Sequence, residues 1–139
     1  MLETLLPNVV RRIRQFLADS SRRRQLMRAR YRELGCTERE VRGLRLLREW
    51  LSAEQLAQFN KYGYFDVTGC QSGKRYRIRY GTATNIHELD RYGRPKAGWC
   101  FVPNQPLVAG DIMLAQKIAL ETDELGALAV AKSFRPTWH

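Results

Sequence analysis

The sequence contains little cysteine, little histidine and few acidic side chains relative to basic ones. Its three cysteines, Cys36, Cys70 and Cys100, are an odd number at long spacings, which excludes a disulfide framework and is typical of reduced thiols. No hydrophobic run approaches the roughly 18 residues that a membrane span needs. We therefore predict a cytoplasmic protein with no membrane-spanning segment.

Motifs for common enzyme chemistries are also missing. The sequence has neither of the two common Gly-rich phosphate-binding loops, and no C-x-x-C or H-x-x-x-H pair for a metal ion. Cys70, His87 and Cys100 are the best remaining candidates for a metal site or a Cys–His nucleophile, and they converge only if the strands between them pair as a meander. We expect no metal, no cofactor and no catalytic residue, and hence a protein that is not an enzyme.

Positive charge is concentrated in one segment. The 139 residues include 24 Lys and Arg against 14 Asp and Glu, a formal net charge of +10. Residues 11–48 hold thirteen Arg, no Lys and four acids, and so carry a net charge of +9. Because a guanidinium group binds phosphate through two donors at once, clustered Arg is typical of polyanion binding. A solvated helix in an Arg-rich protein is the alternative interpretation.

The first third of the chain is predicted to be helical. Apolar residues recur at helical spacing up to about residue 18, and a second, Arg-covered helix is expected to end at Gly35. The first of these two helices is amphipathic. Such a helix packs on a core, docks on a partner or a second copy, or lies on a membrane surface. The candidate partner-binding residues on it are Leu6, Val9, Ile13 and Phe16.

Two capping boxes predict the next two helices. Thr37 is followed by Glu40, and Ser52 is followed by Gln55, so each pair can satisfy the free N–H groups at a helix start. The second of these helices is expected to end at Gly63. The first is expected to pack through Val41, Leu44, Leu47 and Leu51.

After residue 63 the period of the apolar residues changes from about 3.6 to about 2, which predicts strands. Four strands are expected, at residues 64–68, 74–80, 84–89 and 98–102. The connections between them are short, which favours an antiparallel meander. The predicted fold class is α+β: an Arg-rich helical region at residues 1–62, then a three- or four-stranded antiparallel sheet with a C-terminal helix at residues 63–139, in one compact unit.

The C-terminal helix is expected to begin after an Asp111 cap, to break near Thr122 and to continue to Phe134. The carboxylates around this break, Glu121, Asp123 and Glu124, are interpreted as capping and solvated charges. One face of the sheet is expected to be covered by Leu114, Ile118, Leu125, Leu128 and Val130.

Alternation along residues 74–80 separates two faces of one strand. Arg75, Arg77 and Arg79 lie on one face, and Tyr76, Ile78 and Tyr80 lie on the other. Charge and stacking rings are therefore predicted on different faces, unlike the aromatic platform of an RNA-recognition sheet. The three Arg are expected either to contact phosphates or to pair with Glu88 or Asp90 of the next strand.

Two parts of the sequence resemble known families. Residues 37–59, TEREVRGLRLLREWLSAEQLAQF, are similar to the opening of the helix-turn-helix of quorum-sensing regulators, but a strand follows where the recognition helix would stand, so no base-contacting residue is implied. The segments YRIRYG, NIHELD, CFVP and GDIMLAQKIALE resemble a small domain of uncharacterised bacterial and phage proteins. Their hairpin followed by a helix is similar to SWIM-type zinc domains, whose Cys-x-Cys and Cys-x-His ligands are absent from this sequence, so no metal site is implied.

The first functional hypothesis is non-enzymatic binding of DNA or RNA, largely independent of base sequence. The candidate phosphate contacts are Arg22, Arg23, Arg24, Arg28, Arg75, Arg77 and Arg79. The alternative is a protein-interaction, assembly or inhibitor module that docks through the amphipathic N-terminal helix. In that case the Arg would face an acidic protein surface, and a homo-oligomer would form through the N-terminal helices.

Overall fold

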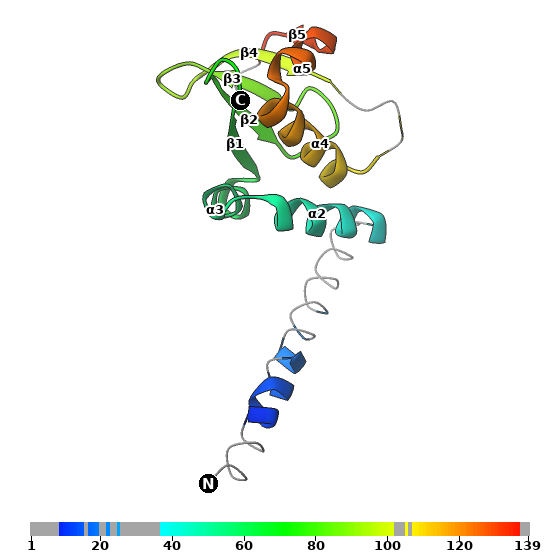
Figure 1. The fold of residues 1–139 in the computed structure, drawn as a ribbon. Coiled ribbons are helices and arrows are strands. Elements are labelled where there is room, and N and C mark those ends of the chain that lie inside the picture. Colours follow the sequence, from blue (N-terminus) through cyan, green and yellow to red (C-terminus); the bar gives the residue numbers. More distant parts are fainter. Residues whose placement is uncertain are drawn as a thin grey trace. The chain divides into compact units, whose positions relative to one another are not determined.

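Helices and one antiparallel sheet make up the residues that the computed structural model describes, which are 9–15, 17–19, 22, 25, 37–101, 105 and 107–136 (Figure 1). The α+β class is therefore confirmed. The chain divides into two compact units, Met1–Val41 and Arg42–His139. Within the described ranges, no helix has both the length and the apolar character needed to cross a membrane.

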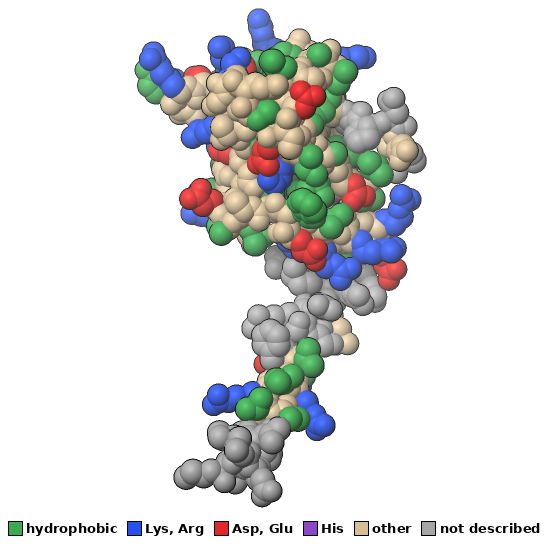
Figure 2. Space-filling model, in the orientation of Figure 1, with side chains coloured by type: hydrophobic (Ala, Val, Ile, Leu, Met, Phe, Trp, Pro, Cys, Tyr) green, Lys and Arg blue, Asp and Glu red, His purple; other side chains and the backbone are tan. Residues whose placement is uncertain are grey.

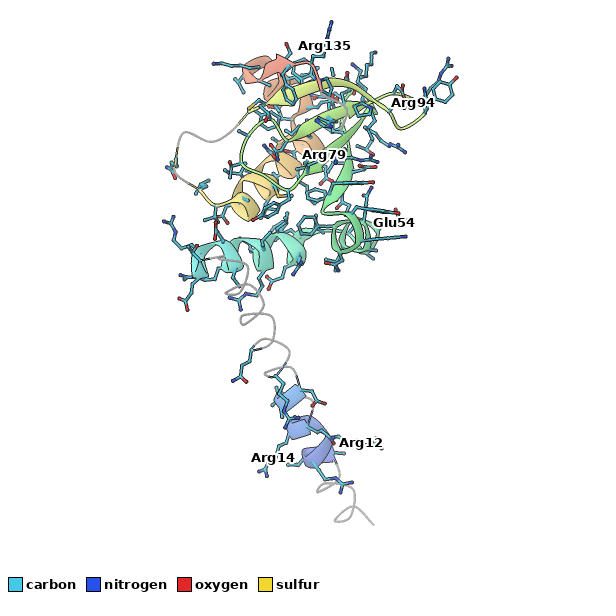
Figure 3. All side chains as sticks on the ribbon, turned by 180° about the vertical axis from the view of Figure 1, so that it is seen from behind. Arg12, Arg14, Glu54, Arg79, Arg94 and Arg135 are labelled. Atoms are coloured by element: carbon cyan, nitrogen blue, oxygen red, sulfur yellow. The ribbon has the colours of Figure 1, made fainter. Side chains whose placement is uncertain are left out.

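The first unit contains a helix with apolar and basic side chains. Residues 9–15 and 17–19 are helical, so the helix includes Asp19, where the sequence predicts its end. Arg12 and Arg14 point to different sides of it (Figure 3). Hydrophobic and basic side chains lie next to each other on its surface (Figure 2). The exposed apolar residues are Val9 (50%), Val10 (41%), Ile13 (54%) and Leu17 (60%).

The labelled elements follow residue 37. In chain order they are α2 (Glu38–Trp50), α3 (Ala53–Tyr62), β1 (Tyr64–Thr68), β2 (Arg75–Arg79), β3 (Ile86–Leu89), β4 (Pro95–Cys100), α4 (Ala109–Thr122), α5 (Glu124–Val130) and β5 (Lys132–Phe134). Both predicted capping boxes are confirmed. The Thr37 amide donates to Glu40 Oε2 (2.6 Å), and the Ser52 amide donates to Gln55 Oε1 (3.0 Å). The αL conformation of Gly63 (φ 76°) ends α3, also as predicted.

The sheet has the strand order β1-β2-β3-β4-β5, and every neighbouring pair is antiparallel. Alternate side chains on its inner side form the core. Helix α4 packs on this side against β1 and β2 (Figure 1). The core side chains of β1, β2 and β3 include Phe65, Val67, Tyr76, Ile78 and Ile86, each at most 2% exposed. The opposite side of the sheet, the outer face, is left for polar side chains.

Helix α3 covers one of the two edges of the sheet, the edge formed by β1. Gln55 Nε2 donates to the Asp66 carbonyl (3.0 Å), and the Asp66 amide donates to Gln58 Oε1 (2.8 Å). Strand β1 is one of the two edge strands of the sheet, and unpaired backbone groups on such a strand invite pairing with another chain. The side chains of Gln55 and Gln58 pair with the outward-facing carbonyl and amide of Asp66, and so they hold α3 beside β1.

The structure corrects the boundaries of two predicted elements. Strand β4 begins at Pro95, three residues before the predicted start at Gly98, because it pairs with β3 as far as Leu89, which lies opposite Pro95. Helix α4 begins at Ala109, so Asp111 lies inside its first turn and is not the cap. The N-cap is Val108, whose side chain forms no capping hydrogen bond.

The last predicted helix is shorter than expected, and a strand follows it. Helix α5 ends at Val130, and residues 132–134 form β5, which pairs with β4. The sheet therefore has five strands, not three or four. A strand of three residues is too short to show alternation of apolar and polar residues in the sequence. Strand β5 forms because it can pair with the edge of β4.

The face of α4 and α5 that covers the sheet also differs from the prediction. Three of the predicted covering residues are exposed: Ile118 (41%), Leu125 (61%) and Val130 (77%). The buried side instead carries Ile112, Met113, Gln116 and Leu120. Gln116 lies there because its amide pairs reciprocally with that of Asn85, at 2.9 and 3.0 Å. A polar residue thus occupies a position that apolar periodicity assigns to the solvent side.

Candidate nucleic-acid interface

One row of residues crosses the outer face of the sheet. Asp66 lies opposite Arg77, Arg77 opposite His87, His87 opposite Gly98, and Gly98 opposite Phe134. Residues paired in this way, and residues two positions apart on a strand, point to the same side. The outer face therefore includes Tyr64, Asp66, Thr68, Arg75, Arg77, Arg79, His87, Gly98, Cys100, Lys132 and Phe134.

Arg77 is held in the centre of the outer face by a two-point ion pair. Its Nε donates to Asp66 Oδ1 (2.9 Å) and its Nη2 to Asp66 Oδ2 (3.1 Å), and both side chains are less than one-fifth exposed. Burial raises the pKa of Asp66, but the hydrogen bonds from Arg77 and Gln58 and the charges of Arg77 and Arg75 lower it below its ordinary value. Asp66 therefore stays ionised at neutral pH and fixes the direction of Arg77.

The predicted pairing of the strand Arg with Glu88 or Asp90 is wrong. Glu88 lies opposite Tyr76, on the inner side of the sheet, where Lys74 Nζ lies 3.0 Å from its Oε1. Asp90 is used by the β3–β4 turn, where its Oδ1 accepts from the amides of Tyr92 (2.8 Å) and Arg94 (2.9 Å). The partner of Arg77 comes from β1, because β1 and β2 bury matching apolar faces and so share their polar ones.

Aromatic rings and charge occur on the same face, contrary to the prediction from β2 alone. The guanidinium carbon of Arg77 lies 4.1 Å from the ring centroid of Tyr64, and that of Arg79 lies 5.2 Å from it. Tyr62 stacks on Tyr64 with ring centroids 5.2 Å apart and planes 9° from parallel. The aromatic residues of this cluster come from β1 and the end of α3, which supply what β2 lacks.

The outer face carries more positive than negative charge. Arg75, Arg79 and Lys132 are exposed, and Asp66 is the single acid among the outer-face residues defined above. Arg79 Nε donates to His87 Nδ1 (3.4 Å). Burial and the charges of Arg79 and Arg77 lower the pKa of His87, so it is neutral at pH 7. A neutral imidazole fits this role, because it accepts from a guanidinium group and adds no further charge.

A hollow of about 380 Å³ opens where the outer face meets α3. It is lined by Glu54, Gln55, Gln58, Asp66, Thr68 and Arg75. Exposed Glu54 projects from α3, which lies beside β1 (Figure 3). The side chains of Glu54, Thr68 and Arg75 form no hydrogen bond with another described residue, whereas both carboxylate oxygens of Asp66 are bound by Arg77. The hollow is therefore lined by polar and charged residues, while the guanidinium group of Arg75 reaches Gly93 in the β3–β4 turn.

Several residues predicted from sequence fall outside the described part of the chain. These are Leu6, Phe16, Arg23, Arg24 and Arg28. Of the other N-terminal candidates, Arg22 is helical and exposed, and Val9 and Ile13 are exposed on the same helical segment.

The three candidate metal or nucleophile residues do not come together. Cys70 is exposed in the β1–β2 turn, where its amide donates to the Leu120 carbonyl (3.1 Å). His87 lies on β3, and Cys100 Sγ accepts from the Thr84 amide (3.4 Å). Across the described ranges, no group of three or more His, Cys, Asp or Glu side chains is placed to hold a metal ion.

One polar residue of structural importance is missed by the sequence prediction. Glu124, interpreted there as a solvated charge, is fully buried at the start of α5. Its carboxylate accepts from the amides of Gln71 (3.1 Å) and Ser72 (2.7 Å) and from the hydroxyls of Ser72 and Tyr76. Burial raises its pKa, but these hydrogen bonds lower it below the ordinary value. The neighbouring Asp123 caps α5 through the Gly126 amide (3.2 Å), as expected.

Chemically, the outer face offers donors for phosphate oxygens and rings for stacking. It provides no nucleophile paired with a base and, among the described residues, no metal-binding cluster. The hollow beside the outer face adds both hydrogen-bond donors and hydrogen-bond acceptors. Comparisons of the chain with protein families, with curated proteins and with solved structures gave no match.

Proposed function

We propose that this protein is a non-enzymatic nucleic-acid-binding protein and that its outer face binds a single strand. The observation that carries this proposal is that three Arg share an accessible sheet face with Tyr64. Proteins that bind single strands combine a positively charged surface, which follows the backbone, with aromatic side chains on which bases stack. The Arg-rich N-terminal segment would add phosphate contacts.

The spacing of the strand Arg supports binding along a chain of phosphates. Residues Arg75 to Arg79 cover four steps of a strand, or about 14 Å at a rise of about 3.4 Å per residue. Arg77 is neutralised by Asp66, so Arg75 and Arg79 are the two groups with charge to spare. Arg77 instead holds the ring of Tyr64, on which Tyr62 stacks, and a base would stack on the exposed ring of Tyr62. Most of the affinity would therefore be independent of base sequence.

The test is a fluorescence anisotropy titration of labelled U12 RNA at several salt concentrations. Each phosphate contact to a single strand contributes a slope of about 0.7 to the logarithm of affinity against the logarithm of salt. Removing two contacts with Arg75→Ala/Arg79→Ala is therefore expected to lower the slope by about 1.4 and to weaken binding roughly twentyfold at 0.1 M salt.

A matched control removes the same charge elsewhere. Arg42 and Arg45 are exposed on α2, so Arg42→Ala/Arg45→Ala has the same net charge as the test variant but an intact outer face. We expect this control to lose much less affinity. Equal losses in the two variants would mean that charge alone, and not the outer face, determines binding. Absence of binding by the unaltered protein at low salt would overturn the proposal.

A second candidate function is docking of a partner helix or a second copy through the N-terminal helix. The observation that favours it is the row of exposed apolar residues, Val9, Val10, Ile13 and Leu17. Soluble helices rarely leave such a row uncovered. Under this hypothesis, light scattering is expected to give at least a dimer, and Ile13→Asp is expected to give a monomer. A monomeric unaltered protein would exclude self-association through this helix.

A further inference from the structure

The turn between β3 and β4, residues 90–94, carries the most exposed tyrosine among the described residues. Tyr92 is 72% exposed, against 55% for Tyr62. The guanidinium carbon of Arg91 lies 5.0 Å from the centre of the Tyr92 ring, and Arg94 is exposed in the same turn. The turn projects from the sheet (Figure 1), and Arg94 lies on it (Figure 3). Positive charge beside an exposed ring is the combination with which proteins bind single strands.

Hydrogen bonds fix the backbone of this turn. Asp90 Oδ1 accepts from the amides of Tyr92 (2.8 Å) and Arg94 (2.9 Å). The Asp90 amide donates to the Arg94 carbonyl (2.8 Å), and the Gly93 amide donates to the Asp90 carbonyl (3.0 Å). Gly93 has the left-handed conformation (φ 76°) that such a tight turn requires. The backbone that carries Tyr92 is therefore already ordered, so a ligand that binds there does not have to order a loop.

The turn is continuous with the outer face at one end of β2. Leu89, the last residue of β3, lies opposite Arg75, so the turn begins beside that end of β2. The side chain of Arg75 reaches the turn, because a Cβ atom placed on Gly93 would lie 3.2 Å from Arg75 Nη2. A strand bound to Arg75 on the outer face is therefore next to the turn.

An aromatic site lies at the other end of β2 as well. Arg79 lies opposite Tyr64, on which Tyr62 stacks, and the row from Arg79 to Arg75 is about 14 Å long. We infer that Tyr92 is a second stacking site for the same single strand. One base stacks on Tyr62 and another on Tyr92, and the phosphates between them pass Arg79 and Arg75. This inference rests on the proposed function, and it extends the interface beyond the outer face to the β3–β4 turn.

The experiment compares labelled U12 RNA with a 12-mer that has the same sugars and phosphates but no bases. Replacement of a stacking ring by alanine costs about fivefold in affinity or more. We therefore expect Tyr92→Ala to weaken U12 binding at least about fivefold and to leave the affinity for the base-free 12-mer unchanged. Tyr92→Phe keeps the ring and is expected to bind U12 as the unaltered protein does. A purely structural role of Tyr92 would change the affinity for both oligomers.

Trp50→Ala is the matched control, because Trp50 is an aromatic residue that is 60% exposed at the end of α2. This control is expected to keep the affinity of the unaltered protein for U12. A titration at protein concentrations well above the dissociation constant is expected to give one U12 per chain. Two U12 per chain would mean that the turn binds a strand of its own, and would overturn the shared path.

The possible failures are distinguishable. If the unaltered protein does not bind U12, the proposed function is wrong and the inference falls with it. If Arg75→Ala/Arg79→Ala weakens U12 binding but Tyr92→Ala does not, the outer face is a nucleic-acid interface and the second stacking site is wrong. Equal losses for U12 and the base-free 12-mer, or equal losses in Tyr92→Ala and Trp50→Ala, would also overturn the stacking site.

Discussion

Glu124→Gln is expected to lower the free energy of unfolding by about 3 kcal/mol, which would make Glu124 one of the most sensitive positions of the chain. The substitution keeps the volume of the side chain but replaces one acceptor oxygen with a donor. Four donors now converge on the carboxylate, and one of them, the hydroxyl of fully buried Tyr76, has no access to water. The amide of glutamine cannot accept from all of them.

The same variant predicts a change in the pH dependence of stability. The pKa of Glu124 is lowered in the folded protein, from an ordinary value of 4.5. The unfolded chain therefore takes up a proton at a higher pH than the folded chain, so the contribution of Glu124 is present above pH 4.5 and is lost as the pH falls below it. Urea unfolding at pH 7 and at pH 3 is expected to give a smaller gap between the two proteins at the lower pH.

Glu49→Gln is the matched control, because Glu49 is exposed on α2. This control is expected to change stability by no more than about 0.5 kcal/mol at either pH. If Glu124→Gln unfolds at the same urea concentration as the control, the buried carboxylate does not hold the start of α5 to the β1–β2 turn. Such a result would leave the cap from Asp123 to the Gly126 amide as the contact of an acid that fixes the start of α5.

Local signals in the sequence predicted part of this fold well. The capping boxes at Thr37 and Ser52 determine two helix starts within four residues each, and Gly63 marks a helix end by its own conformation. Strands β1 and β2 have enough residues for alternation to appear. Strand β5 and the buried position of Gln116 depend on partners far along the chain, β4 and Asn85, and no local pattern contains them.

The composition of the outer face could be predicted in part. Two adjacent strands that bury Phe65 and Ile78 opposite each other must also share their polar faces. That rule places Tyr64 beside Arg79 and Asp66 beside Arg77, and it needs only the alternation of the two strands. The hollow could not be found in this way, because Glu54 reaches it from a helix whose position beside β1 depends on Gln55 and Gln58.

Gly110→Ala is expected to destabilise the protein by about 3 kcal/mol, although alanine is the better helix former. Helices α2 and α4 approach each other closely at Gly110. A Cβ atom there would lie 2.2 Å from the carbonyl carbon of Gly43, 2.4 Å from its oxygen and 2.5 Å from the amide nitrogen of Leu44. These are backbone atoms, so the clash is relieved only if the start of α4 moves away from α2.

Substitution of Gly43, which faces Gly110, tests whether the clash with backbone atoms causes the loss of stability. A Cβ atom on Gly43 would lie 2.6 Å from Cγ2 of Val108, a side-chain atom that a rotation can move. Gly43→Ala is therefore expected to cost less than Gly110→Ala, because a side chain yields more easily than a backbone. Urea unfolding measures both variants. An isolated helix gains about 1 kcal/mol from this substitution, so a stabilised Gly110→Ala would mean that the two helices are not in close contact.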